Sequence, residues 1–157
     1  MAPVPNLKCL LVREQPAGPA SVLACGPGAV AGILRAVYRG ADRESFAVLL
    51  LDQKNHVLGI NQVSLGTLTQ TCVHPREVFR PAIVAPCATI ILAHNHLSGD
   101  PSPSAEDEKV TKRLIEVGAL VGIPVLDHVI VACRTEAWFS FRDARPELFS
   151  GQSVYRE

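Results

Sequence analysis

Residues 88–107 read ATIILAHNHLSGDPSPSAED, and this stretch decides how the rest of the chain folds. Residues 88–93 form an unbroken apolar run, which is typical of a central strand buried on both faces. The Gly, Pro, Ser and Asp residues of 97–103 predict a loop. Residues 104–121 are then the clearest helix in the sequence. The apolar residues of this helix recur at helical spacing: Val110, Leu114, Val117 and Val121.

The sequence on either side predicts an α/β sandwich, a mixed sheet with helices on both sides. We expect a helix from Pro27 to Gly40 and another that opens at His74 and stops at Pro86. Expected strands are 45–52, 56–65, 67–73, 125–132 and 137–141. Residues 8–12 are expected as an edge strand or a meandering arm, and the chain after Arg145 as a polar tail.

Composition favours one soluble domain. The 157 residues are 48% hydrophobic and 19% charged, which excludes a disordered tail or a coiled coil. Fifteen basic and fifteen acidic residues give no net charge, unlike a strongly basic nucleic-acid-binding protein. The five cysteines are widely spaced without a C-x-x-C pair, which fits a reducing cytoplasm. We find no signal peptide, and the apolar run 81–93 is too short for a bilayer, so we expect a cytoplasmic protein without membrane contact.

Two histidines and an aspartate around the loop 97–103 are candidate metal ligands. His94 and His96 are two residues apart in a strand, so their side chains point to the same face. Asp107 extends the apolar stripe of the following helix and should therefore face the sheet, where a carboxylate needs compensation. Two imidazoles and one carboxylate converging on a point would make a three-ligand zinc site whose fourth position is open, as in catalytic zinc sites.

A simpler interpretation exists for part of this pattern. Ser104 and Asp107 are spaced as a helix N-terminal cap, in which Ser104 binds first-turn amides and Asp107 favours the helix dipole. An isolated H-x-H pair is also a weak signal. Capping leaves the two histidines at the end of a buried strand unexplained, and capping and metal ligation can coexist.

The complete spacing H-x-H-x(7)-S-x(2)-D, made by His94, His96, Ser104 and Asp107, resembles the JAMM motif of the MPN+/JAB metalloprotease fold. The stretches HNHLSGDPSPS, GTLTQTCVHPREVF and GIPVLDHVIV are similar to the RadC branch of that superfamily. The resemblance implies an MPN/JAB (cytidine-deaminase-like) mixed β-sheet sandwiched by helices. It divides the chain into an N-terminal arm (1–26), a RadC-like JAB domain (27–145) and a polar C-terminal tail (146–157).

The resemblance also implies a zinc-dependent hydrolase. Zn²⁺ held by His94, His96 and Asp107 would activate a water molecule to attack an amide or isopeptide bond in a peptide or isopeptide substrate. Ser104 would hydrogen-bond the developing oxyanion. Glu44, at the entry of the strand after the first helix, matches the position of the family's general base. Glu77 is the other candidate, although a carboxylate opening a helix has an ordinary structural explanation.

Other functions stay open at this stage. The RadC branch carries a DNA-repair label, which would make the chain a nucleic-acid-processing protein, although its zero net charge argues against tight DNA binding. A non-catalytic MPN interaction module is the third alternative. Leu97 stands where the family usually has proline, which leaves substrate positioning in doubt. The substrate's identity and the oligomeric state are not encoded in any recognisable motif.

Three further histidines have structural interpretations. His74 precedes a proline and is expected in a loop, and His56 is expected in a turn. Asp127 and His128 lie inside an apolar strand and need buried partners, so we expect a hydrogen-bonded pair or a supporting role beside the metal ligands.

Overall fold

A computed structural model of the chain describes residues 8–10, 22–66 and 73–152. The elements are α1 (Pro27–Val37), β1 (Ser45–Leu51), β2 (Val57–Leu65), α2 (Pro75–Val84), β3 (Thr89–His96), α3 (Ala105–Val121), β4 (Val125–Ala132), β5 (Trp138–Ser140), α4 (Phe141–Ala144) and the 3-10 helix η1 (Pro146–Phe149).

The five strands form one mixed sheet in the order β2-β1-β3-β4-β5. β1 and β2 are joined by a tight turn and pair antiparallel, whereas β3 and β4 are joined through α3 and pair parallel, as a helical crossover requires. β3 lies in the middle, with Phe46 of β1 opposite His94 on one side and Ile130 of β4 opposite His94 on the other. β3 is therefore paired on both edges as far as His94, and Asn95 and His96 beyond it pair with β4 alone.

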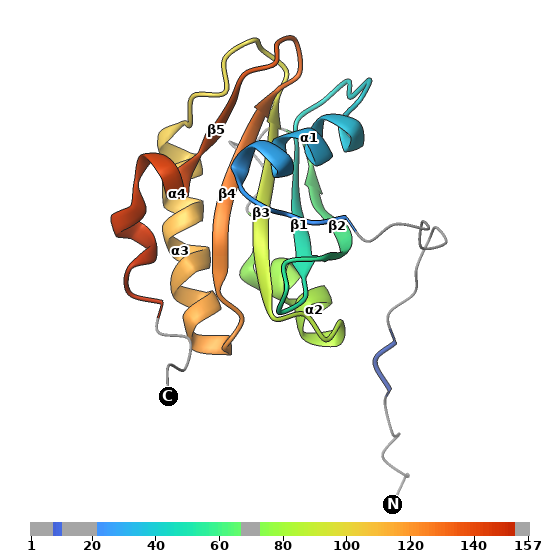
Figure 1. The fold of residues 1–157 in the computed structure, drawn as a ribbon, viewed down its shortest axis with the longest axis vertical. Coiled ribbons are helices and arrows are strands. Elements are labelled where there is room, and N and C mark those ends of the chain that lie inside the picture. The colour runs from blue at the N-terminus through green and yellow to red at the C-terminus, as the bar shows by residue number, and fades with distance from the viewer. Residues whose placement is uncertain (1–7, 11–21, 67–72, 153–157) are drawn as a thin grey trace, which may run out of the picture.

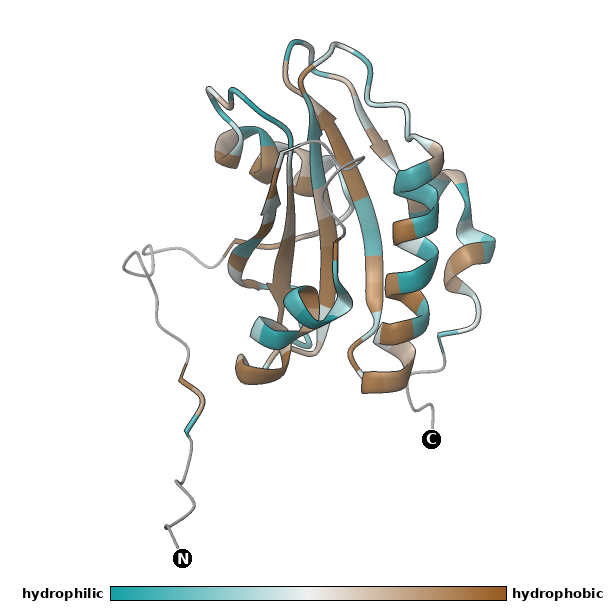
Figure 2. Ribbon diagram, turned by 180° about the vertical axis from the view of Figure 1, so that it is seen from behind, coloured by the Kyte–Doolittle hydropathy of each residue, from teal (hydrophilic) through white to brown (hydrophobic). Residues whose placement is uncertain are grey.

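Helices cover both faces of this sheet. α1 lies over one face (Figure 1), while α2 and α3 lie over the opposite face, seen from behind in Figure 2. The two faces carry separate apolar clusters, one containing Leu34 of α1 and the other containing Phe79 of α2 and Leu114 of α3. All seven residues of β1 are buried, because both of its faces are covered. The predicted α/β sandwich is confirmed.

The structure describes three of the predicted segments only in part. The strand expected at 67–73 lies outside the described residues except for Val73, which is buried but belongs to no strand. Of residues 8–12, expected as an edge strand or a meandering arm, the described residues 8–10 have no regular secondary structure, and 11–12 lie outside the described residues. The end of the expected arm pairs with the sheet edge, because Leu23 bridges His56 next to β2.

The first part of the expected polar tail, residues 146–152, has defined structure. Pro146–Phe149 form η1, and the Phe149 side chain is buried in the same apolar cluster as α2 and α3. Gln152 then donates to and accepts from the backbone of Val125 at the start of β4. Phe149, Leu148 and the Gln152 hydrogen bonds thus dock this polar stretch, which its composition does not reveal.

Within the described parts of the chain, no helix combines the length and apolar character that crossing a membrane would require.

Close packing of α3 on β4 predicts that Gly118→Ala destabilises the fold. A Cβ at Gly118 would lie 2.7 Å from the carbonyl oxygen of Ile123. We expect a loss of about 1–3 kcal/mol in the free energy of unfolding, measured by urea denaturation. Gly32→Ala in α1 is the matched control, because nothing lies within 4 Å of that Cβ. The control should gain about 0.5–1 kcal/mol from helix propensity. Equal effects at both positions would contradict the packing argument.

Candidate metal centre

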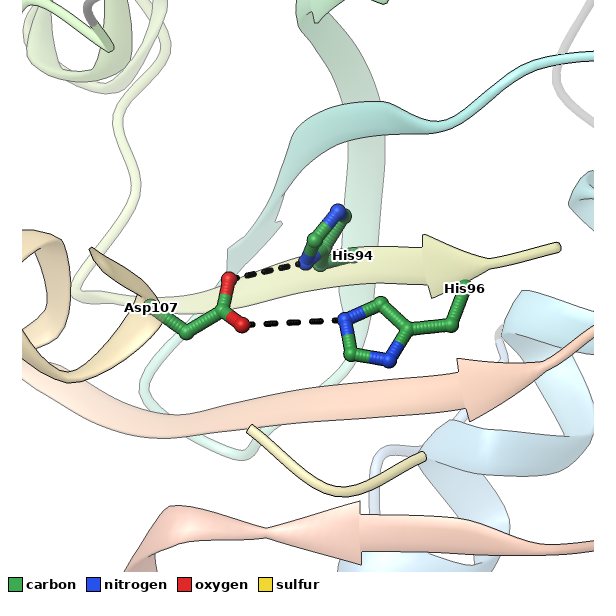
Figure 3. Close-up of side chains that lie close together, drawn as sticks. All are labelled: His94, His96 and Asp107. Carbon is green, nitrogen blue, oxygen red and sulfur yellow. Dashed lines mark ion pairs between the residues drawn. The ribbon is translucent and has the colours of Figure 1, made fainter. Parts of the chain in front are cut away.

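The last residues of β3 and the first turn of α3 bring the predicted ligands together (Figure 3). His94 and His96 lie on the same face of β3, because side chains alternate along a strand. Asp107 is the third residue of α3 and is 1% exposed, so the prediction that it faces the sheet is confirmed. The loop between β3 and α3 returns the chain so that the carboxylate meets both rings.

The donor atoms are close enough to share one ion. His94 Nδ1 lies 3.1 Å from Asp107 Oδ1, and His96 Nε2 lies 3.6 Å from Asp107 Oδ2. One donor atom from each of the three residues lies within 4.8 Å of the others. The group could therefore hold a metal ion.

The tautomer of His96 is fixed by the loop that follows it. His96 Nδ1 lies 3.1 Å from the carbonyl oxygen of Asp100, which can only accept a hydrogen bond. Nδ1 therefore carries a proton and donates to this carbonyl, and Nε2 is the ring nitrogen that faces Asp107. A ring nitrogen that donates to a backbone carbonyl is the usual support of a metal-binding imidazole.

Buried polar atoms without hydrogen bonds mark the centre as suited to a cation. Among the described residues, both ring nitrogens of His94 and the Oδ1 of Asp107 are buried and lack a hydrogen-bond partner, because the 3.1 Å contact between Nδ1 and Oδ1 lacks hydrogen-bond geometry. Unsatisfied polar atoms in a protein interior are rare and costly. A cation shared by these atoms would satisfy them, so the residues present fit a metal.

Ser104 caps α3 and orients the carboxylate through the same contacts. Its Oγ accepts from the Asp107 backbone N–H at 3.1 Å and donates to Asp107 Oδ2 at 2.7 Å. The Ser104 backbone N–H also donates to Oδ2 at 2.7 Å, which completes a capping box. The helix cap therefore exists as the simpler interpretation predicted, and it turns the remaining oxygen, Oδ1, toward His94.

The surrounding groups keep Asp107 ionised. Burial alone would raise the pKa of Asp107, but the contacts from His94 and His96 and the hydrogen bonds from Ser104 outweigh burial and hold this pKa far below its usual value. In return, Asp107 raises the pKa of His96. The centre thus has a permanent negative charge at the point where the two imidazoles meet.

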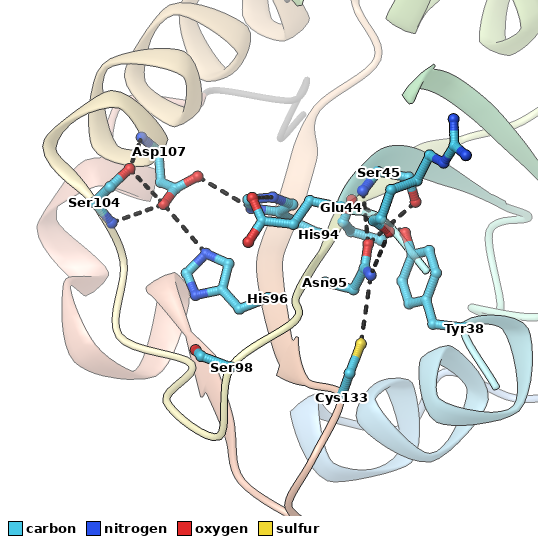
Figure 4. A network of polar contacts seen from close by, with 12 residues as sticks. Tyr38, Glu44, Ser45, His94, Asn95, His96, Ser98, Ser104, Asp107 and Cys133 are labelled. Atoms are coloured by element: carbon cyan, nitrogen blue, oxygen red, sulfur yellow. Dashed lines mark hydrogen bonds and ion pairs between the residues drawn. The ribbon is translucent and has the colours of Figure 1, made fainter. Parts of the chain in front are cut away.

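Of the two candidate general bases, only Glu44 contacts the centre. Its Oε2 lies 4.0 Å from His94 Nε2, and its side chain is 26% exposed (Figure 4). Glu77 instead forms ion pairs with Arg76 and Arg80 in the first turns of α2. The structure therefore brings Glu44, and not Glu77, to the candidate ligands.

Thr111 is a residue that the sequence reasoning missed. Its Oγ1 lies 2.6 Å from the Asp107 carbonyl oxygen and 2.6 Å from His128 Nδ1. Because the hydroxyl has one proton and the carbonyl can only accept, His128 Nδ1 must donate to Thr111. Thr111 follows Asp107 by one helical turn on the buried face of α3, and this spacing is the signal that could have revealed it.

The other polar residues singled out in the sequence have structural partners. Asp127 accepts from Ser140 Oγ at 2.6 Å, so its side chain and that of His128 have separate partners. His74 caps α2 by accepting from the Arg76 backbone N–H. His56 contacts the Asp52 carboxylate at the turn before β2.

A mixed sheet covered by helices, with an H-x-H pair ending its central strand and an aspartate opening the next helix, defines a JAB-type domain. The family model described as "RadC-like JAB domain" matches residues 25–146, and the chain belongs to this family.

Curated relatives share half of the matched residues. A UPF0758 protein of Rubrobacter xylanophilus is 50% identical over 117 residues, which are 74% of this chain and 50% of the relative. A UPF0758 protein of Moorella thermoacetica is 54% identical over 105 residues, which are 67% of this chain and 46% of the relative. The chain thus spans about half the length of the curated relatives it matches, and their names state no activity.

The buried His128 predicts acid sensitivity of the metal-free fold. Burial lowers the pKa of His128 to about 3 from 6.5, so below pH 6.5 the unfolded chain binds this proton and the folded chain does not. Stability is therefore lost as the pH falls from 6.5 toward 3. His128→Phe should lose about 2 kcal/mol less than the wild type between pH 7 and pH 5, measured by urea denaturation with a chelator present. Parallel pH profiles would contradict this assignment.

Proposed function

We propose that the chain is a zinc-dependent hydrolase of the JAMM metallopeptidase type that cleaves an amide or isopeptide bond. One observation carries the proposal: His94, His96 and Asp107 present donor atoms within 4.8 Å of one another, among them buried nitrogens without partners. Glu44 adds a carboxylate at the open side of this group.

The donor set favours zinc over the hard divalent cations. Two imidazoles and one carboxylate are a common ligand set of catalytic zinc, whereas Mg²⁺ and Ca²⁺ prefer oxygen ligands. Three protein ligands leave one position of a tetrahedron open. When bound there, Zn²⁺ would lower the pKa of a water molecule and polarise a substrate carbonyl.

Glu44 moves the proton in this proposal. Its carboxylate accepts a proton from the attacking water and later donates it to the leaving amine. The 4.0 Å separation from His94 Nε2 places Oε2 beside the centre without making Glu44 one of the three ligands. Its partial exposure leaves space for a substrate next to it.

Ser104 supplies a hydrogen bond to the oxyanion that forms on the substrate carbonyl. Its hydroxyl proton points to Asp107 Oδ2 at 2.7 Å, so Ser104 must turn this proton toward the substrate when it acts. Asp107 Oδ2 still keeps the backbone N–H of Ser104 as a donor, which limits the cost of that rotation.

The metal part of the proposal predicts one zinc per chain by elemental analysis. His94→Ala and Asp107→Ala should each retain less than about a tenth of the wild-type zinc after dialysis, because each removes one of three ligands. His74→Ala is the matched control, since His74 caps α2 and contacts none of the ligands. A wild-type protein that takes up no zinc at micromolar metal would contradict the proposal.

If Glu44 is the general base, substitution of Glu44 and of Glu77 should affect the cleavage rate differently. Glu44→Gln should keep its zinc and lose at least about 10²-fold in the rate of cleavage of an internally quenched peptide library, because the amide cannot accept the proton. Glu77→Gln removes a carboxylate whose partners are Arg76 and Arg80, and it should cleave like the wild type. A zinc-loaded wild type that cleaves no amide bond, or a fully active Glu44→Gln variant, would show that the proposal is wrong.

A further inference from the structure

Asn95 lies between the two candidate ligands and points the other way. His94 and His96 face α3, so strand alternation directs the Asn95 side chain to the face covered by α1. Asn95 is completely buried. A buried amide has two donors and two acceptor sites to satisfy, and its partners show what the residue does.

All four hydrogen-bonding positions of this amide are used. Oδ1 accepts from the Ser45 backbone N–H at 2.7 Å and from Ser45 Oγ at 3.2 Å. Nδ2 donates to the Arg43 carbonyl oxygen at 3.1 Å and to Cys133 Sγ at 3.4 Å. The orientation is unique, since a flipped amide would set donor against donor at Ser45 and acceptor against acceptor at Arg43.

The two backbone partners of Asn95 flank Glu44. The antiparallel ladder of β1 and β3 reaches Phe46 opposite His94 and then stops. Beyond that point the Asn95 side chain replaces the strand-to-strand hydrogen bonds. It binds the peptide group before Glu44 and the peptide group after it. The Glu44 carbonyl itself accepts from the Gly66 backbone N–H at 2.7 Å.

This arrangement determines where the Glu44 carboxylate lies. Ser45 turns toward Asn95 and is buried, so alternation sends the side chains of Glu44 and Phe46 to the opposite face, where His94 lies (Figure 4). Glu44 precedes β1 and is partly exposed, so the strand ladder alone does not hold it. Its backbone is tied instead to the strand that carries both imidazoles.

We propose that Asn95 is a positioning residue for Glu44: one buried amide, inserted between His94 and His96, fixes the backbone on both sides of the general base relative to the metal ligands. This inference rests on the proposed function for the role of Glu44. Asn95 touches neither substrate nor metal. Its effect is to hold the base and the ligands in one rigid frame, which a proton transfer over hydrogen-bond distance needs.

The first test measures, in the zinc-loaded full chain, the hydrogen bond between the Asn95 side chain and the Ser45 backbone N–H. Asn95→Ala removes the acceptor of the Ser45 N–H, and the amide hydrogen of Ser45 should exchange about tenfold faster or more by NMR. Asn61→Ala is the matched control: within the described part of the chain, this asparagine of β2 donates to the adjacent Gln62 carbonyl alone, and the Ser45 exchange rate should stay at the wild-type value. An unchanged Ser45 rate in Asn95→Ala overturns the proposal.

The second test asks whether the Asn95 side chain affects catalysis through the position of Glu44. Asn95→Ala should retain its zinc, lower kcat on the quenched peptide library by about tenfold or more with KM unchanged, and have no further effect in a Glu44→Gln background. If Asn95 has a purely structural role, Asn95→Ala loses zinc, or its fold reduction of kcat multiplies with that of Glu44→Gln in the double variant. Either result overturns the proposal.

A second variant and a crystal structure allow the role of Asn95 to be tested separately from the hydrolase activity. If Asn95→Ala does not fold, Asn95→Asp keeps the acceptor for Ser45 and loses the donor to Arg43, and it should lower kcat in the same way; wild-type kcat in this variant overturns the proposal. A wild type that cleaves no peptide contradicts the hydrolase instead. In that case a crystal structure of zinc-loaded Asn95→Ala decides the inference, since an undisplaced Glu44 carboxylate overturns it.

Discussion

A carboxylate enclosed at the junction of β3 and α3 is the constraint on which the rest of the site depends. Asp107 is 1% exposed, and ionised carboxylates are stable in such surroundings only when charge and hydrogen bonds compensate them. Ser104 satisfies one oxygen through two hydrogen bonds. The other oxygen has only the ring of His94 beside it. A cation bound next to Asp107 would therefore stabilise the buried carboxylate, and the positions of His94 and His96 determine where that cation can bind.

Strand alternation gives the three consecutive residues 94–96 of β3 different roles on the two faces of the sheet. His94 and His96 face α3 and meet the carboxylate, while Asn95 faces α1 and holds the start of β1. The end of a central strand is suited to this, because both of its faces are covered, while the β1 ladder stops at His94 and leaves the Asn95 side chain to bind the start of β1. Thr111 adds a link from the first turn of α3 to His128 on β4. The two imidazoles therefore come from β3, the carboxylate from α3, and Glu44 from the residue just before β1, which Asn95 ties to β3.

The sequence predicted the elements whose periodicity is strong and the site residues that share a local pattern. The apolar run of β3, the alternation of His94 and His96, and the place of Asp107 on a helical stripe all follow from spacing within 20 residues. The partners of Asn95 did not, because Ser45 is 50 positions away and meets it only through the β1–β3 register. Burial of Phe149 in η1 was missed for another reason, because the polar composition of residues 146–157 does not show that this ring packs against the core.

X-ray absorption spectroscopy at the zinc edge tests the central claim most directly, because it identifies the atoms bound to the metal in solution. The account predicts two imidazole nitrogens at about 2.0–2.1 Å, one carboxylate oxygen at a similar distance, and one further light atom. A shell containing sulfur at about 2.3 Å, or a shell without imidazole scattering, would contradict the assignment of His94, His96 and Asp107 as the metal centre.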